Sequence, residues 1–213
     1  MKTISVTASE MKQIEYEANE AGLTYTQMME NAGRSAYEEI VQEKEILKKT
    51  VTVVVGKGNN GGDGYVIARL LHKSGINVSI IQADGEPKTE DAILNCNKCK
   101  NFGIDFIALN NAEKAINDAD IIVDAIYGTG FKGEFKPEIL KLCNKINQSK
   151  AVVFALDIPS GINSDTGEVC DGAVMANTTV VFHLLKKAHT KKEICNYFGE
   201  IMLKDIGIVI KQA

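Results

Sequence analysis

A glycine-rich segment, residues 56–64, carries the residue types best suited to binding an anion. It reads Gly-Lys-Gly-Asn-Asn-Gly-Gly-Asp-Gly and follows residues 51–55, a β-branched run typical of a buried parallel strand. Apolar residues at helical spacing resume at Tyr65. Glycines let backbone N–H groups approach a ligand, and the start of a helix favours negative charge. The segment therefore predicts a strand, a tight phosphate-binding turn and a helix.

Two standard nucleotide motifs explain this turn only in part. Gly56, Gly58 and Gly61 fit the G-x-G-x-x-G dinucleotide fingerprint, which also requires an acidic residue at the end of the second strand. The candidate, Asp84, lies beyond that expected strand in a turn-like segment, so ordinary NAD binding stays an alternative. The P-loop motif is excluded because Gly61 is not followed by Lys and Ser or Thr. The adjacent amide and carboxylate side chains suggest that a cation or ligand hydroxyls bind beside the phosphate.

Length and composition place the chain among globular α/β proteins. Its 213 residues, 45% of them hydrophobic, suffice for a full core without disulfides or metals. The net charge is −4 and the basic residues are scattered, which argues against a nucleic-acid partner. No apolar stretch reaches membrane-spanning length, and the N-terminal segment is charged and helical in pattern. We therefore expect a cytoplasmic protein with neither a nucleic-acid nor a membrane partner.

Cysteines and histidines do not form a recognisable metal or disulfide pattern. The five cysteines lack the spacing of a disulfide framework, which predicts a reducing compartment. Cys96 and Cys99 form a lone C-x-x-C, which we interpret as two residues on one helix face because no second pair completes a zinc site. His72, His183 and His189 are dispersed, and each is interpreted as a surface or core residue.

Strand and helix patterns alternate along the chain. This alternation predicts a Rossmann-like three-layer α/β/α sandwich with a mostly parallel sheet. Thr7 with Glu10 fits a capping box at the start of the first helix. No repeat or linker interrupts the pattern, so we expect a single domain over residues 1–213. The expected strands are 51–55, 77–82, 105–109, 119–126, 151–156, 178–182 and 200–204, and the expected helices start near residues 7, 24, 65, 88, 112 and 138.

Carboxylates occur at the ends of two apolar strands. Asp124 lies near the end of residues 119–126, and Asp157 follows residues 151–156. A carboxylate next to a buried strand is costly unless it is paired or lies at the rim, so both are functional candidates. Asp124 could alternatively cap the turn that follows it. Because ligands bind outside the carboxyl ends of open parallel sheets, we expect both aspartates and the glycine turn to meet there.

Four segments together resemble the NAD(P)H-hydrate epimerase family, also called the YjeF N-terminal domain. They are residues 29–33 (Met-Glu-Asn-Ala-Gly), 56–64, 124–131 (Asp-Ala-Ile-Tyr-Gly-Thr-Gly-Phe) and 157–161 (Asp-Ile-Pro-Ser-Gly). The resemblance implies an isomerase that interconverts the R and S epimers of hydrated NADH and NADPH, NAD(P)HX, in nicotinamide nucleotide repair. It also implies a homodimer. Relatives often carry a fused dehydratase; in this chain we expect none, and functional pairing with a separate NAD(P)H-hydrate dehydratase is possible.

The resemblance further implies one potassium ion, K+, per subunit and a set of substrate contacts. Asn60, Asp124 and Ser160 would hold the ion together with backbone carbonyls, an oxygen shell suited to a hard, weakly charged cation. The substrate-binding residues that it implies are Asn59, Asn60, Gly61, Gly62, Asp63, Gly128, Thr129, Gly130, Phe131, Lys132, Gly133, Glu134 and Asp157.

Chemistry at C6 of the hydrate suggests the catalytic residues. C6 bears a hydroxyl and the ring nitrogen, so loss of water leaves an iminium and re-addition on the other face inverts the centre. This path needs a group that protonates the leaving hydroxyl and takes a proton from incoming water, and we assign Asp157. Lys186 matches a family lysine and is expected to assist, although Lys187 and Ala188 replace the usual proline and glycine. A binding module without the reaction and an ordinary Rossmann oxidoreductase remain the alternatives.

Overall fold

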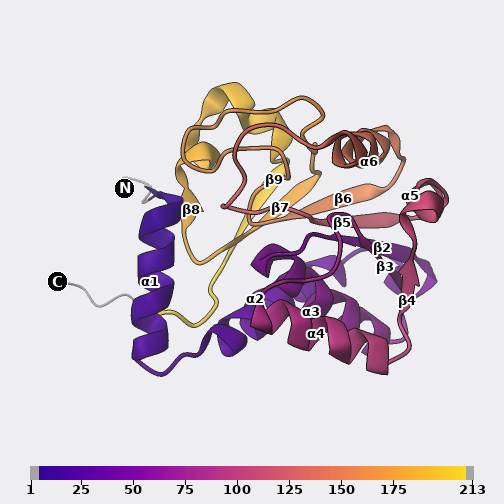
Figure 1. Ribbon diagram of the computed structural model, residues 1–213, viewed down its shortest axis with the longest axis horizontal. Helices are drawn as coiled ribbons and strands as arrows, with labels where there is room; N and C mark the ends of the chain where they lie inside the picture. The colour runs from indigo at the N-terminus through magenta and orange to yellow at the C-terminus, as the bar shows by residue number, and fades with distance from the viewer. Residues whose placement is uncertain (1–4, 210–213) are drawn as a thin grey trace.

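Seven parallel strands form the central sheet of the computed structural model, which describes residues 5–209 (Figure 1). The strand order is β4-β3-β2-β5-β6-β7-β9, and each neighbouring pair is parallel. The bounds are β2 (Thr50–Val55), β3 (Asn77–Gln82), β4 (Asp105–Ile107), β5 (Ile121–Ala125), β6 (Val152–Leu156), β7 (Thr178–Phe182) and β9 (Glu200–Lys204).

Helices cover both faces of this sheet. They are α1 (Ala8–Glu20), α2 (Tyr25–Ile40), α3 (Asn59–Lys73), α4 (Glu90–Asn101), α5 (Ala112–Asp118) and α6 (Pro137–Gln148), with short 3-10 helices η1 (Ile46–Lys48), η2 (Leu109–Asn111), η3 (Lys187–Thr190) and η4 (Lys192–Tyr197). Figure 1 shows α2, α3 and α4 on one face, α5 and α6 on the other, and α1 at the side of the molecule. The predicted three-layer α/β/α sandwich is confirmed. Thr7 with Glu10 forms the predicted capping box of α1.

Alternate side chains of each strand enter two different cores. Val53 and Ile80 belong to the core shared with α2, α3 and α4, whereas Val54 and Ile81 belong to the core under α5 and α6. All four side chains are fully buried. A parallel strand covered on both faces is apolar at most positions, which explains the valines at positions 51, 53, 54 and 55 of β2.

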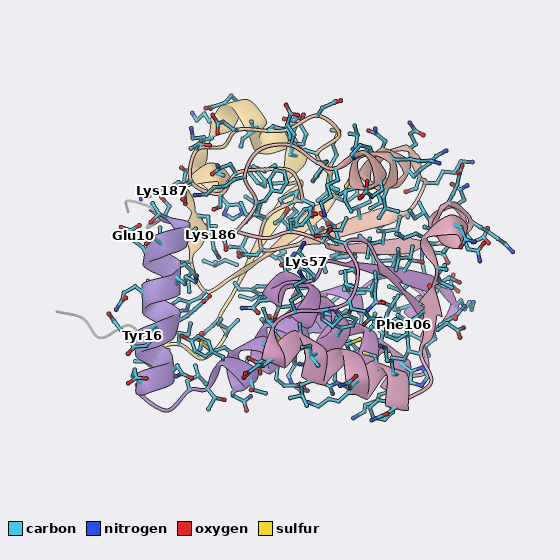
Figure 2. The ribbon with its side chains drawn as sticks, viewed as in Figure 1. Glu10, Tyr16, Lys57, Phe106, Lys186 and Lys187 are labelled. Carbon is cyan, nitrogen blue, oxygen red and sulfur yellow. The ribbon has the colours of Figure 1, made fainter. Side chains whose placement is uncertain are left out.

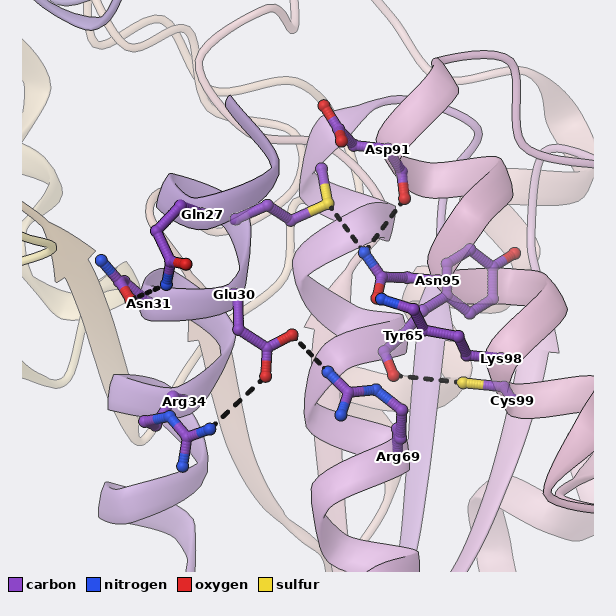
Figure 3. A network of polar contacts seen from close by, with 11 residues as sticks. Gln27, Glu30, Asn31, Arg34, Tyr65, Arg69, Asp91, Asn95, Lys98 and Cys99 are labelled. Carbon is purple, nitrogen blue, oxygen red and sulfur yellow. Dashed lines mark hydrogen bonds and ion pairs between the residues drawn. The ribbon is translucent and has the colours of Figure 1, made fainter. Parts of the chain in front are cut away.

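The layer of α2, α3 and α4 fixes the position of the glycine turn. A Cβ on Gly33 of α2 would lie 2.5 Å from Val66 of α3, so only glycine lets these helices pack so closely. Beside this contact, Glu30 of α2 forms an ion pair with the buried Arg69 of α3 and a second one with Arg34 at 3.5 Å (Figure 3). The start of α3 is thereby held against α2 as well as against the sheet.

Two features differ from the sequence predictions. Helix α3 begins at Asn59 and not at Tyr65, because tight packing of its glycines overrides their low helix propensity. In addition, β1 (Ser5–Val6) pairs in parallel with β8 (Leu185–Lys186). Strands of two residues are too short to be predicted from a sequence pattern. Among residues 5–209, no helix is long and apolar enough to cross a membrane.

Candidate active site

A cleft of about 740 Å³ opens at the carboxyl ends of β2, β5, β6 and β7. It lies at the switch point of the sheet, because the chain runs from β2 to β3 on one side while β5 lies on the other. Helices α1 and α2 close it on a further side. Figure 2 shows two of its basic side chains, Lys57 near the centre of the molecule and Lys186 beside α1. Its volume is typical of a site for a small organic ligand.

The turn between β2 and α3 brings main-chain groups to this cleft. A Cβ on Gly56 would lie 1.9 Å from the carbonyl oxygen of Ile126, and one on Gly61 would lie 2.0 Å from the carbonyl oxygen of Gly56. Packing therefore requires glycine at both positions. Gly58 precedes α3 without a side-chain cap and lines the cleft, so the first N–H groups of the helix are available to a ligand. Such a helix terminus is a ready anion-binding site.

Asp124 connects two of the loops at the cleft. Its carboxylate is fully buried and accepts hydrogen bonds from Ser160 N–H at 2.8 Å, Ser160 Oγ at 2.6 Å and Ile126 N–H at 3.2 Å. Burial raises the pKa of Asp124 to about 6, and the hydrogen bonds from Ser160 and Ile126 oppose that rise. The contact with Ile126 is the turn-capping role that the sequence left open, and the contacts with Ser160 join the loop after β5 to the loop after β6.

The three residues expected to bind potassium come from three adjoining parts of the fold: Asn60 from the first turn of α3, Asp124 from β5 and Ser160 from the loop after β6. Asn60 contacts the loop after β5, since a Cβ on Gly128 would lie 3.1 Å from its Oδ1. The Asn60 Nδ2 is buried and has no hydrogen-bond partner. In the flipped orientation of the amide, its oxygen occupies this position in place of the nitrogen. A bound cation would then be the missing partner of that oxygen. One carboxylate, one amide, one hydroxyl and the nearby Tyr127 carbonyl, 3.2 Å from Ser160 Oγ, fit a hard monovalent cation.

Asp157 and Lys186 form a buried ion pair at the cleft. The Lys186 ammonium contacts Asp157 Oδ1 and donates to the carbonyl oxygen of Phe182 at 3.0 Å. Only 1% of Lys186 and 9% of Asp157 is exposed. Lys186 belongs to β8, whose pairing with β1 fixes it in place. A loop without the proline and glycine of the family pattern thus still brings an ammonium group to the strand-end carboxylate.

Two further carboxyl groups line the same cleft. They are Glu15 of α1 and Asp63 of α3. Burial raises the pKa of Asp63 well above its usual value, and the charges of Asp157 and Glu15 raise it further while Lys186 lowers it. Burial, and secondarily the Asp157 charge, also raises the pKa of Glu15. Asp63 therefore keeps its proton more readily than an exposed aspartate, and it shares one cleft with the carboxylate of Asp157.

Most of the predicted site residues line this cleft. Those that do are Asn59, Asn60, Asp63, Gly128, Thr129, Gly130, Phe131, Lys132, Asp157 and Lys186. Gly61 and Gly62 are buried instead, Gly61 against Gly56 and Gly62 against Met29. Gly133 and Glu134 are exposed farther along the loop after β5.

Asp84, the candidate ribose-binding acid of the dinucleotide fingerprint, is engaged by two lysines. Lys57 Nζ lies 2.7 Å from one carboxylate oxygen and Lys136 Nζ 2.8 Å from the other. Burial acts to raise the pKa of Asp84, but the contacts with both lysines outweigh it and lower the pKa. Each oxygen that would accept a ribose hydroxyl already receives an ammonium group, which argues against ordinary NAD binding by this fingerprint.

The sequence patterns predicted no role for Glu15 or for His189. Glu15 lies one helical turn after Met11, on the face of α1 that is buried at Met11 and Ala18, so a charge on an apolar face was the available signal. His189 contacts the backbones of Asp157 and Lys186. The contact with Lys186 is local, across three positions of the chain, whereas the contact with Asp157 forms only in the tertiary structure and could not be predicted from spacing in the sequence.

Comparisons with known proteins agree with this geometry. The family model described as YjeF-related protein N-terminus matches residues 25–188. An NAD(P)H-hydrate epimerase of Limosilactobacillus reuteri is 38% identical over 210 residues, which cover 95% of each chain. A bifunctional NAD(P)H-hydrate repair enzyme of Archaeoglobus fulgidus is 37% identical over 204 residues, which cover 95% of this chain and 41% of that protein.

A solved structure shows the same fold. The crystal structure of the yeast protein ynu0 superposes with a TM-score of 0.81 at 23% sequence identity, covering 98% of this chain and 90% of that chain. All four segments that carried the resemblance in the sequence lie within the matched residues 25–188. The chain therefore belongs to the YjeF-related N-terminal family, the family of the NAD(P)H-hydrate epimerases.

Proposed function

We propose that this protein is an NAD(P)H-hydrate epimerase, an isomerase that interconverts the R and S epimers of hydrated NADH and NADPH in nicotinamide nucleotide repair. Relatives of matching length named for this activity are 34–38% identical to the chain. The observation that carries the proposal is the buried Asp157–Lys186 ion pair in a cleft that also contains the uncapped start of α3.

The cleft has parts suited to both ends of such a substrate. The free N–H groups at the start of α3 favour a pyrophosphate. Tyr127 and Phe131 also line the cleft, with ring centroids 5.4 Å apart, and they offer an apolar wall to a planar ring. Phosphate and ring would thus be held by different walls, with the ring directed toward the ion pair.

The ion pair can perform the proton transfers of the reaction. The Asp157 carboxylate first accepts a proton and then donates it to the C6 hydroxyl, the C6–O bond breaks, a water molecule departs and an iminium remains. A water molecule then adds to C6 on the opposite face and returns a proton to the carboxylate, so no net proton is consumed. Lys186 holds the Asp157 carboxylate in place, because its ammonium is itself fixed by the carbonyl of Phe182. Asp63 lies in the same cleft and can supply the proton that Asp157 transfers.

One potassium ion would be held by Asn60, Asp124 and Ser160 together with the carbonyl of Tyr127. The ion would supply positive charge to the buried Asp124, whose three hydrogen-bond donors are all neutral. These residues join the glycine turn to the loops after β5 and β6. If the proposal holds, adding potassium in place of a large organic cation raises the thermal midpoint of the wild type and does so much less in Asp124→Asn.

Three proposals concern the oligomeric state, the partner enzyme and the cellular compartment of the protein. A homodimer follows from the family resemblance, with α1 and α2 as expected contributors to the interface. A separate dehydratase partner is supported by the relative of Archaeoglobus fulgidus, a longer protein named as a bifunctional repair enzyme. The five cysteines are free thiols, which fits the reducing environment of the cytoplasm. The binding-module alternative is disfavoured because both strand-end aspartates are present and lie at the cleft or behind its wall.

The rate of epimer interconversion tests the proposed function. Separated R and S epimers of hydrated NADH are incubated with the purified protein in potassium buffer, and their interconversion is followed against the spontaneous rate. We expect clear acceleration in both directions. A folded protein that leaves the spontaneous rate unchanged would contradict the proposal and favour the binding module.

A further inference from the structure

His189, in η3, contacts both members of the ion pair through their backbones. Its Nδ1 accepts a hydrogen bond from the N–H of Lys186 at 2.9 Å, and its Nε2 lies 2.9 Å from the carbonyl oxygen of Asp157. The residue is 8% exposed, and its ring packs against Phe198 with centroids 5.0 Å apart. One imidazole thus bridges two segments that lie 29 positions apart along the chain.

These contacts select one protonation state of the ring. An N–H donor requires a bare Nδ1, and a carbonyl oxygen requires a hydrogen on Nε2. Burial lowers the pKa of His189 to about 4, with the Asp157 charge opposing this and the Lys186 charge adding to it. The ring is therefore neutral near pH 7, and a proton added at Nδ1 would face the N–H of Lys186.

Both bridged residues occupy positions that need support. Asp157 has a left-handed backbone, with φ of 61°, a conformation that costs a residue other than glycine about 1 kcal/mol. Its N–H bonds the carbonyl of Val180 at 2.8 Å and its carbonyl bonds His189, so both sides of the strained residue are held. Lys186 is the last residue of β8, followed by Lys187 and not by the proline of the family pattern. The histidine bridge holds the backbone of Lys186 through its N–H, next to the position where the family pattern has a proline.

We propose that His189 is a positioning residue for epimerisation: its neutral imidazole sets the orientation of the Asp157 carboxylate relative to the Lys186 ammonium. His189 acts through these two residues, because it lies behind the cleft wall that they form. The proposal rests on the function proposed above and adds to it a residue that the family resemblance did not imply.

Three substitutions at position 189 separate hydrogen bonding from packing. His189→Phe keeps a ring against Phe198 and removes both hydrogen bonds. His189→Asn keeps an acceptor for the Lys186 N–H, and His189→Gln keeps a donor that reaches toward the Asp157 carbonyl. Ile194→Ala is the matched control, since Ile194 lies in the same small core as Ala188 and Phe198 and its side chain has no polar atom that could bond the ion pair.

Steady-state kinetics give the first readout. We expect His189→Phe to lower kcat by about 10- to 100-fold, the range for a small displacement of catalytic groups, with KM changed by less than about threefold. The pH profile of kcat should shift, and Asn or Gln should restore part of the loss. Ile194→Ala should lower stability and keep both kcat and its pH profile. A folded His189→Phe variant with the kcat and pH profile of the wild type would overturn the proposal.

Nitrogen NMR of the wild-type protein gives a second readout that needs no variant at position 189. Spectra of His72→Gln and His183→Gln assign the third histidine by elimination. We expect a neutral ring with the hydrogen on Nε2 at pH 7, and a charged ring or the opposite tautomer would overturn the bridge. A wild type that does not epimerise would reject the proposed function itself, whereas an active wild type with the wrong tautomer would reject only the role of His189.

Discussion

The turn between β2 and α3 and the segment from β7 to η3 bring groups to the same cleft, but different forces hold them. Main chain packs on main chain in the turn, where a Cβ at Gly56 or Gly61 would overlap a carbonyl oxygen. Side chains hold the other segment, through the Lys186 ammonium and the His189 imidazole. The comparison indicates that Gly56 and Gly61 of the turn allow almost no other residue, whereas the segment from β7 to η3 can lack a proline and a glycine if hydrogen bonds compensate.

Substitution of Gly56 should produce the largest loss of stability. Gly56→Ala places a methyl group 1.9 Å from the Ile126 carbonyl oxygen, and we expect the free energy of unfolding to fall by about 3 kcal/mol or more. Gly58→Ala is the control, because a Cβ there meets nothing within 4 Å and φ is −96°. Its effect should stay within about 0.5 kcal/mol in the same denaturant titration. Equal losses in both variants would mean that close main-chain packing does not hold the turn.

In the segment from β7 to η3, the histidine bridge predicts that the stability of the protein depends on pH. The pKa of His189 is about 4 in the folded protein against an ordinary 6.5, with Asp157 and Lys186 as the charged groups that face it. The unfolded chain therefore binds more protons between these values. This contribution is fully present above pH 6.5 and is lost as pH falls toward 4, a change of up to about 3 kcal/mol.

The checking measurement is the free energy of unfolding from pH 4 to 7.5 for the wild type and for His189→Phe. The wild type should lose more stability than the variant as the pH falls, so that the two curves converge. Curves that stay parallel across this range would show that His189 is not held neutral by its site.

Ser160→Ala tests the contact between the two loops and should have a smaller effect. The hydroxyl donates to Asp124 at 2.6 Å and accepts from the N–H of Tyr127 at 2.9 Å, so its loss leaves buried polar groups without partners. We expect a loss of about 2 kcal/mol in the free energy of unfolding. Ser149→Ala removes only a half-buried hydrogen bond to Ile146 and should cost about 0.5 kcal/mol. A reversed order of the two losses would contradict the role of Ser160.

Local patterns in the sequence predicted the sheet and much of the candidate site. Valine runs, glycines and strand-end aspartates are each visible within a few residues, and the parallel sheet then places the ends of β2, β5 and β6 together. The start of α3 was predicted too late because Gly61 and Gly62 suggest a turn, whereas packing against Gly56 and Met29 stabilises a helix there. Glu15 and His189 could not be placed, since Asp157 becomes their neighbour only when α1 and η3 dock.

The Asp157→Asn variant tests most directly the claim that the Asp157–Lys186 pair moves the proton during epimerisation. Asparagine tolerates the left-handed backbone at this position, so the variant should fold and bind substrate with KM within about threefold of the wild type. We expect kcat for interconversion of the two epimers of hydrated NADH to fall by about 10³-fold, the loss typical of a general acid–base group. A folded variant that keeps kcat within about tenfold of the wild type would contradict the account, because proton transfer by this carboxylate would then not be needed.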